Sequence, residues 1–201
     1  MSVIYHIRRH IFAMPLDEIC TTSDFLKYGI RSSIDSSLSR LVGKGILIRV
    51  ADGVFLRAGS RIPTAQEIAI AKAGKFGKEV VEYCGNLAAE LSISSDQCDP
   101  DVFGTDGRTS SFDTIHGRVK LVHVGGRRRR IGTSKSAKAA RSLWFMKEAD
   151  YKLTATALAS LNKDDRQKLE DLICWMPASL SNQFVRRVRP KKKIVQSDTL
   201  C

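Results

Sequence analysis

The residues best suited to chemistry lie on one side of a helix that we expect to run to about Lys44. That side carries the small hydroxyl residues Ser33, Ser36 and Ser37 near its N-terminal end, and Arg40 and Lys44 near its other end. Small side chains allow a helix to lie deep in the major groove of DNA, where an arginine can hold guanine through two hydrogen bonds. A lysine can neutralise a phosphate. The pattern therefore predicts a helix that reads double-stranded DNA.

The opposite side of this segment is apolar, which gives the helix a face to bury. We expect Ser32 or Ser33 to cap the helix and Gly45 to end it. The apolar residues are spaced i, i+4, i+7 and i+8, as in an amphipathic helix: Ile34, Leu38, Leu41 and Val42.

Two earlier segments are also expected to be helical. Residues 3–12 carry an apolar stripe at helical spacing and stop before Pro15. Thr22 or Ser23 is expected to cap a short helix that ends at Gly29, and Leu16 and Ile19 between the two helices are expected to face the core.

A β-hairpin follows the third helix. Residues 46–50 and 54–57 read as strands joined by the strong turn signal Asp52–Gly53. Three helices and a hairpin within sixty residues predict a winged helix-turn-helix, in which the hairpin is the wing. Arg49 and Arg57 on the hairpin, with Arg31 before the third helix, would then hold phosphates beside it.

A small three-helix domain with a hairpin can also bind protein, and a serine-rich face can simply be solvated. The composition favours the DNA interpretation, because 33 lysines and arginines against 21 aspartates and glutamates give a net charge of +12. Basic residues exceed acidic ones by 8 to 5 in residues 1–60, 13 to 9 in 61–140 and 12 to 7 in 141–201. The excess is therefore spread along the chain rather than confined to the winged helix.

The N-terminal motifs carry a family resemblance. The run SDFLKYGIRSSIDSSLSRLVGKGILIRVADGVFLR is similar to the N-terminal winged helix of AbiEi-type antitoxins, where D-F-x-x-x-G precedes a helix ending S-R-L-x-x-x-G, a strand, a glycine turn and a V-[YF] strand. A helix after Pro63 also fits. The matching positions are Asp24, Phe25, Gly29, Ser39, Arg40, Leu41, Gly45, Arg49, Gly53, Val54, Phe55, Glu67, Ile68 and Ala69.

This resemblance covers residues 1–75, whereas over residues 76–190 only the order of elements agrees. It implies a transcriptional autorepressor that is also the antitoxin of a bacterial phage-defence toxin–antitoxin pair. The chain departs from the family in the middle, where GKEVVEYCGNLAAELSIS is more charged than the alanine-rich segment often found there.

The rest of the chain is expected to be mixed in structure. Thr64 and Glu67 form a capping-box pattern for a helix to Lys72, a strand or short helix follows near Val80, and residues 86–91 read as helix. Strands are expected at 102–103, 111–115 and 118–124, and helices at 136–149, 154–161, 164–173 and from Pro177. The fold class is thus α+β, a winged helix-turn-helix followed by a small α/β unit and a C-terminal helical segment. We place the domains at residues 1–60 and 61–189, followed by a basic disordered tail at 190–201.

The sharpest local charge is the run Arg127, Arg128, Arg129 and Arg130. It can contact nucleic acid, dock an acidic partner or discourage pairing at a solvated strand edge. The C-terminal RRVRPKKK run is typical of a tail that holds phosphates without sequence preference. The glycines at 104–108 and 125–127 lack a phosphate-loop pattern and read as hairpin turns.

Several classes of protein do not fit. No nucleophile elbow, zinc-protease or kinase motif occurs, so we expect no enzyme and no cofactor. His6 and His10 would share a helix face without cysteine or acidic helpers, so we expect no metal site, and the five cysteines form no CxxC pair. No stretch of about 18 apolar residues occurs, and the first residues lack a secretory signal, which predicts a cytoplasmic protein.

The function expected from the sequence is therefore a DNA-binding autorepressor and antitoxin, whose partners are an operator in its own promoter and a cognate toxin. The alternatives are a protein-interaction antitoxin module without specific DNA binding, and a nonspecific nucleic-acid-binding protein.

Overall fold

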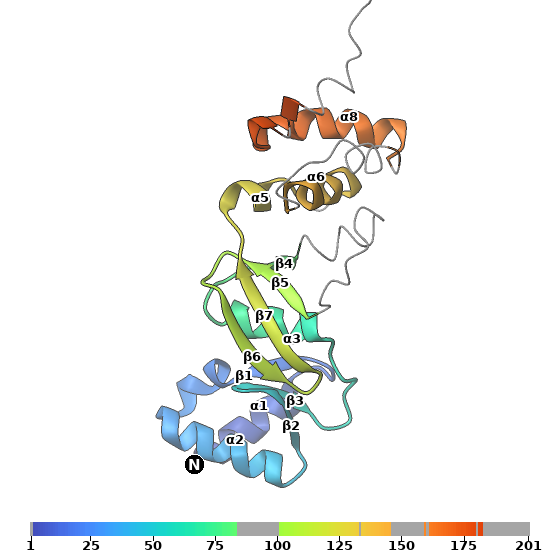
Figure 1. Cartoon of the computed structure of the whole chain (residues 1–201). Coiled ribbons are helices and arrows are strands. Elements are labelled where there is room, and N and C mark those ends of the chain that lie inside the picture. The colour runs from blue at the N-terminus through green and yellow to red at the C-terminus, as the bar shows by residue number, and fades with distance from the viewer. Residues whose placement is uncertain are drawn as a thin grey trace, which may run out of the picture. The chain divides into compact units, whose positions relative to one another are not determined.

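The computed structural model describes residues 2–83, 101–132, 134–145, 159, 161–179 and 181–182. Contacts divide the chain into two units, the first made of Met1–Tyr83 and Asp99–Val124 and the second of Cys84–Cys98 and Gly125–Cys201. The chain is mixed α/β, with one seven-stranded sheet and several helices (Figure 1). Among the described residues, no helix has both the length and the apolar character needed to cross a membrane.

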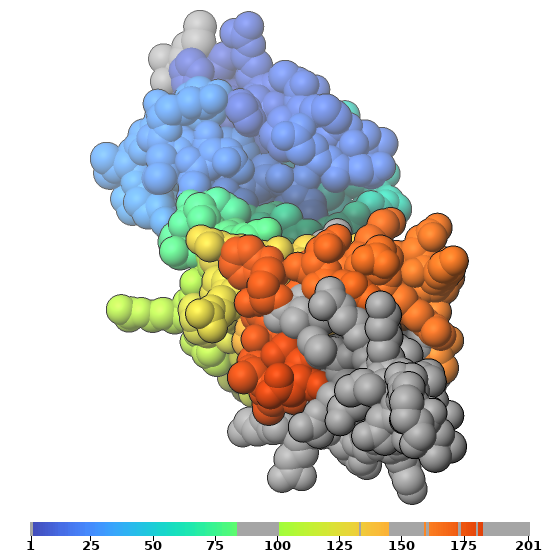
Figure 2. Space-filling view, turned by 90° about the horizontal axis from the view of Figure 1, so that it is seen from above, coloured from blue at the N-terminus to red at the C-terminus, as the bar shows by residue number. Residues whose placement is uncertain are grey.

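Three helical segments open the first unit: α1 (Val3–Ala13), the 3-10 helix η1 (Thr22–Tyr28) and α2 (Arg31–Gly43). Helices α1 and α2 lie side by side, dark and lighter blue in Figure 2. Their apolar stripes form one core with Phe25 of η1, which confirms the helical spacing predicted from the sequence. The serine cap expected for α2 is wrong, because the helix begins at Arg31 and Ile30 stands at its N-cap.

The sheet is built from seven short strands in the order β1-β3-β2-β6-β7-β5-β4. Neighbouring strands run antiparallel except β5 and β7, which are parallel. The bounds are β1 (Ile19–Thr21), β2 (Leu47–Ala51), β3 (Val54–Arg57), β4 (Val80–Glu82), β5 (Val102–Thr105), β6 (Ser110–Thr114) and β7 (Gly117–His123).

The predicted hairpin is present, but it is part of this larger sheet. Strands β2 and β3 pair around the Asp52–Gly53 turn, and β1, which the sequence reading missed, pairs with β3. On its other side β2 meets β6 at one pair, Ala51 with Thr114. Residues 1–60 therefore share one sheet with the strands that follow. Leu16 is 54% exposed, so the expectation that it faces the core is wrong.

Helix α3 (Ala65–Gly74) packs against the sheet at the centre of a second apolar cluster. Its buried residues Ile68, Ala69 and Ala73 lie against side chains of β2, β3, β5 and β7. The predicted capping box is confirmed: Glu67 N–H donates to Thr64 Oγ1 at 3.2 Å, and the Thr64 N–H donates to Glu67 Oε2 at 2.7 Å.

The second unit is helical in its described part, with α5 (Gly126–Arg130), α6 (Lys135–Phe145), α8 (Lys163–Leu172) and the 3-10 turn η2 (Ile173–Trp175). Alanines of α6 pack with Leu143, Leu161 and Leu169 in its core. The predicted cap of α8 is confirmed, since Asp165 N–H donates to Asn162 Oδ1 at 2.7 Å. The helix expected at 86–91 and the basic tail lie outside the described residues, as does most of the helix expected at 154–161.

One expectation near residue 126 is wrong, and one of the alternatives left open there is excluded. Gly125 and Gly126 do not form a hairpin turn, because Gly125 is the N-cap of α5 and Gly126 its first residue. The arginine run therefore forms a short helix rather than a strand edge.

Candidate nucleic-acid interface

The exposed side of α2 is polar along its whole length. Ser32, Ser36 and Arg40 follow one another one turn apart on this side. Lys44, exposed directly after the helix, continues the same line. Thirteen residues make α2 about 20 Å long. The helix thus presents a narrow polar ridge with hydroxyls at one end and cations at the other.

Ser33 and Ser37 are less exposed than the serines of that ridge. Ser37 is 7% exposed and its hydroxyl donates to the carbonyl oxygen of Ser33 at 2.7 Å. Ser33 itself is half-buried. Ser39, expected from the sequence only as a position of the family resemblance and not as a site residue, is exposed beside Arg40. Its spacing of i+3 from Ser36 could have indicated this.

One cation of α2 is paired with a carboxylate, whereas in the part of the chain that the structure describes the cations toward its C-terminal end are not. Arg31 Nε lies 2.9 Å from Asp35 Oδ2, an exposed i,i+4 ion pair that offsets the carboxylate. Among the described residues, neither Arg40 nor Lys44 has a carboxylate within ion-pair distance. Arg40 near the end of α2 and Lys44 directly after it are therefore two cations that are open to an anionic partner.

A polar hollow of about 380 Å³ adjoins the serine end of the ridge. It lies where the first residues of α1, Ser2 to Ile4, meet α2, and it is lined by Ser32, Ser33, Ser36, Ser37 and Arg40. The structure thus brings five of the predicted site residues together in one concave surface.

The predicted arginines of the hairpin have aromatic neighbours. The Arg49 guanidinium lies 5.4 Å from the centre of the Phe55 ring and remains exposed. Arg57 is half-buried, with its guanidinium 4.8 Å from the Phe12 ring of α1. Such cation–π contacts hold a guanidinium in place while leaving its edge free to donate hydrogen bonds.

The hairpin turn is held by its neighbours. Gly53 has φ +70°, a left-handed conformation that favours glycine, and it is buried. Thr22 N–H donates to its carbonyl oxygen at 3.0 Å, and the Lys72 ammonium donates to the Asp52 carbonyl oxygen at 2.7 Å. The turn is therefore fixed to η1 and α3. The sequence reading missed Lys72, because its partner is twenty residues away.

The arginine run belongs to the second unit, and its four side chains differ in exposure and in contacts. Arg128 lies 5.1 Å from the Trp144 ring and Arg130 lies 5.8 Å from the Trp175 ring. Arg129 is half-buried, whereas Arg127 is exposed. Two of the four arginines thus contact tryptophans of their own unit.

The only thiol in the first unit's described part is buried. Cys20 is 2% exposed, and burial together with the nearby Asp24 carboxylate raises its pKa to about 12. The group stays a neutral thiol at physiological pH and does not act as a nucleophile.

One comparison with known proteins bears on this chain. A protein-family model described as a family of unknown function (DUF6088) matches residues 6–140. No curated protein matches the sequence. The matched range includes α2, the hairpin, α3 and the strands that follow.

Proposed function

We propose that this chain, which belongs to the DUF6088 family, is a sequence-specific DNA-binding transcription regulator. The observation that carries the proposal is the exposed ridge of α2, in which small hydroxyls are followed by Arg40 and Lys44. A helix with this profile fits the major groove, where a bulky or acidic ridge would be excluded by shape or charge. The net charge of +12 favours the same kind of partner.

The order of the N-terminal elements supports a winged helix-turn-helix. A helix, a short strand, two further helical segments and a hairpin follow one another, and β1, β3 and β2 lie together at one end of the sheet. In this interpretation η1 and α2 are the helix-turn-helix pair, α2 is the recognition helix, and β2 and β3 form the wing.

The contacts divide by chemistry. Ser32, Ser36 and Arg40 would reach base edges, because they occupy the exposed line of α2. Lys44 and Arg49 would hold phosphates, which positions the protein without reading sequence. Arg31 would join them if a phosphate replaced its Asp35 partner.

The resemblance of residues 1–75 to AbiEi-type antitoxins extends the proposal. The chain would bind an operator in its own promoter and neutralise a toxin encoded next to it. Co-expression with a neighbouring nucleotidyltransferase-like reading frame tests this part. Expression of that reading frame alone should inhibit growth, and co-expression of this chain should restore it.

The DNA-binding part is tested by selecting duplexes from a random library and measuring affinity by fluorescence anisotropy at several salt concentrations. Arg40→Ala should cost about 1–3 kcal/mol of binding free energy and relax the preference at one base position. Lys44→Ala should weaken binding to all sequences alike and reduce the salt slope. Lys120→Ala, which removes an exposed cation from β7, is the matched control.

Three results would contradict the proposal. If the selection enriches no sequence, and a folded Arg40→Ala variant binds DNA as tightly as the wild-type chain, then α2 is not a recognition helix. Equal affinity for selected and random duplexes would indicate a nonspecific nucleic-acid-binding protein. Toxin neutralisation with no DNA binding at low salt would indicate a protein-interaction module.

A further inference from the structure

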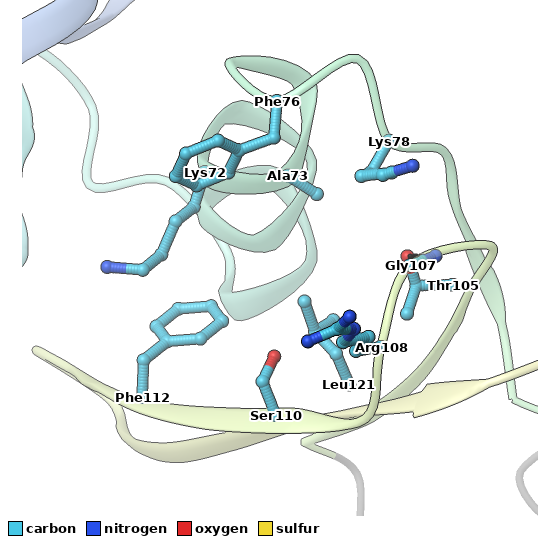
Figure 3. A pocket seen from close by; sticks show the side chains of 10 residues that line it. All are labelled: Lys72, Ala73, Phe76, Lys78, Thr105, Gly107, Arg108, Ser110, Phe112 and Leu121. Atoms are coloured by element: carbon cyan, nitrogen blue, oxygen red, sulfur yellow. Dashed lines mark hydrogen bonds between the residues drawn. The ribbon is translucent and has the colours of Figure 1, made fainter.

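A second hollow lies in the first unit, away from the serine ridge, between α3 and the strands β5 to β7. Its volume is about 240 Å³ (Figure 3). One wall comes from the end of α3 and the turn after it, with Ala73 and Phe76, and the other comes from β6 and β7, with Phe112 and Leu121. The hollow is thus formed within one unit by residues that the sheet and α3 hold in place.

The walls are apolar and partly aromatic. Ala73 and Leu121 are buried, at 5% and 6% exposed, whereas Phe76 is 68% exposed. Figure 3 shows the Phe76 and Phe112 rings on facing walls, one from the helix side and one from β6. Exposed aromatic area beside a hollow is the feature that a flat apolar ligand would cover.

Cations surround these walls. Lys72, Lys78 and Arg108 line the hollow, and no aspartate or glutamate is among its lining residues. Among the described residues, Lys78 and Arg108 form no ion pair. The carboxylate of Asp106 accepts a hydrogen bond from Glu79 N–H at 2.9 Å and lines an adjoining hollow, to which Lys78 and Arg108 also belong. The lining therefore favours an anion.

Lys72 is the most constrained of these cations. Its ammonium lies 4.8 Å from the Phe112 ring centre and bonds to the Asp52 carbonyl oxygen. Its pKa is lowered, chiefly because burial disfavours the charge and secondly because Lys75 is close. A bound anion would offset both effects.

We propose that this hollow binds a small planar aromatic carboxylate. The rings of Phe76 and Phe112 would contact the flat faces of the ligand, and Arg108 with Lys78 would hold the carboxylate, for which a guanidinium is a bidentate partner. The volume is below that of pockets for drug-sized ligands, about 300–1,000 Å³, so the ligand has one or two rings rather than the size of a nucleotide or peptide.

The same geometry links the hollow to the hairpin. A ligand ring that contacts Phe112 would meet the Lys72 ammonium, which lies against the same ring, and Lys72 is one of the two groups that hold the turn. Occupancy of the hollow therefore changes the hydrogen bonding of the Asp52–Gly53 peptide. This site and its link are independent of whether the chain binds DNA.

Binding is tested on the full chain by calorimetric titration with salicylate, indole-3-acetate and 2-naphthoate. At least one should bind saturably, and 2-naphthalenemethanol, which lacks the carboxylate, should bind about tenfold more weakly than 2-naphthoate, as expected for loss of a charge-assisted contact. The double variant Arg108→Met, Lys78→Met should raise Kd about tenfold or more. Both residues are exposed, so thermal melting should show an unchanged fold.

Lys120→Met is the matched control, because it removes a cation next to Leu121 in β7 whose side chain points to the other face of the sheet. It should leave Kd unchanged. Binding to none of the three carboxylates, equal binding of the alcohol, or an equal effect of Lys120→Met would overturn the site. Preferential binding of single-stranded DNA that is lost in Phe76→Ala would also overturn it, in favour of base stacking.

The link is tested by nuclear magnetic resonance. The Gly53 amide signal should shift with ligand concentration in the wild-type chain and should not shift in Lys72→Met that still binds ligand. Ligand binding that leaves the Gly53 signal unmoved in the wild-type chain would refute the link while preserving the site.

Discussion

The hydroxyl of Ser37 donates a 2.7 Å hydrogen bond to the carbonyl oxygen of Ser33, one turn earlier in α2. A serine that bonds back to its own helix in this way has its donor already used. Ser36, its neighbour, is exposed and forms no such bond among the described residues. Two adjacent serines thus differ in what they can offer a ligand.

This difference gives a prediction for DNA binding. Ser36→Glu should weaken binding to the selected duplex by about 1–3 kcal/mol, because it places a negative charge on the face proposed to meet phosphates and base edges. Ser37→Ala should change the binding free energy by less than about 0.5 kcal/mol, as for a substitution without a ligand contact. Anisotropy titrations of both variants measure this, and an unchanged affinity of Ser36→Glu would place Ser36 outside the interface.

The capping box of α3 gives a pH prediction. Glu67 also bonds to Arg61, at 2.7 Å, and these partners lower its pKa from 4.5 to about 2, the Arg61 hydrogen bond being the largest cause. Because the folded pKa is the lower one, the stabilisation is complete above about pH 4.5 and is lost as the pH falls through about 2.

The wild-type chain should have a higher free energy of unfolding than Glu67→Gln at neutral pH, and this difference, measured by urea denaturation, should shrink as the pH falls through this range. Added salt should reduce it at neutral pH, since the carboxylate side chain is 39% exposed. Glu18→Gln, an exposed acid after α1, controls for the loss of one negative charge. A stability difference that is constant from neutral pH to pH 2 would show that the Glu67 charge is not responsible.

The arginine run gives a paired prediction. Arg128→Ala should lower the thermal stability of the second unit, because its contact with Trp144, in which both residues are half-buried, is worth about 0.5–2 kcal/mol. Arg127→Ala should leave stability unchanged, because Arg127 is exposed and among the described residues it forms no cation–π contact. Tryptophan fluorescence during thermal unfolding measures both. Equal stability of the two variants would mean that the Trp144 contact contributes nothing.

Gly104 is required by close packing within the sheet. A Cβ atom there would lie 2.8 Å from Val124 Cγ2 and 2.9 Å from Val81 Cγ2, and valine side chains are too stiff to move away easily. Gly104→Ala should destabilise the first unit by about 1–3 kcal/mol. Gly43→Ala, at the end of α2 in open space, should be neutral or slightly stabilising. Urea denaturation that ranks the two variants the other way would contradict this packing.

The features predicted correctly from the sequence are those fixed by near neighbours in the chain. The stripe Ile34, Leu38 and Leu41 predicted α2, the Asp52–Gly53 pair predicted the hairpin, and Thr64 with Glu67 predicted the start of α3. The signal in each case spans at most two helical turns. The start of α2 was placed wrongly because a serine cap is only a local preference, and here Ile30 takes that position.

The sequence by itself determined most of the helices and strands of the first unit, with β1 as an exception, and that one helix carries hydroxyls and cations opposite an apolar face. Only the tertiary structure decided that β1 completes the hairpin, that Ser37 turns inward, and that Phe76 and Arg108 share a hollow with Phe112. The physical reason is the distance along the chain over which each interaction acts. Periodicity and capping act within a few residues. Burial and contacts such as Lys72 with Asp52 instead depend on how β2, β3 and α3 pack, which no short stretch of sequence specifies.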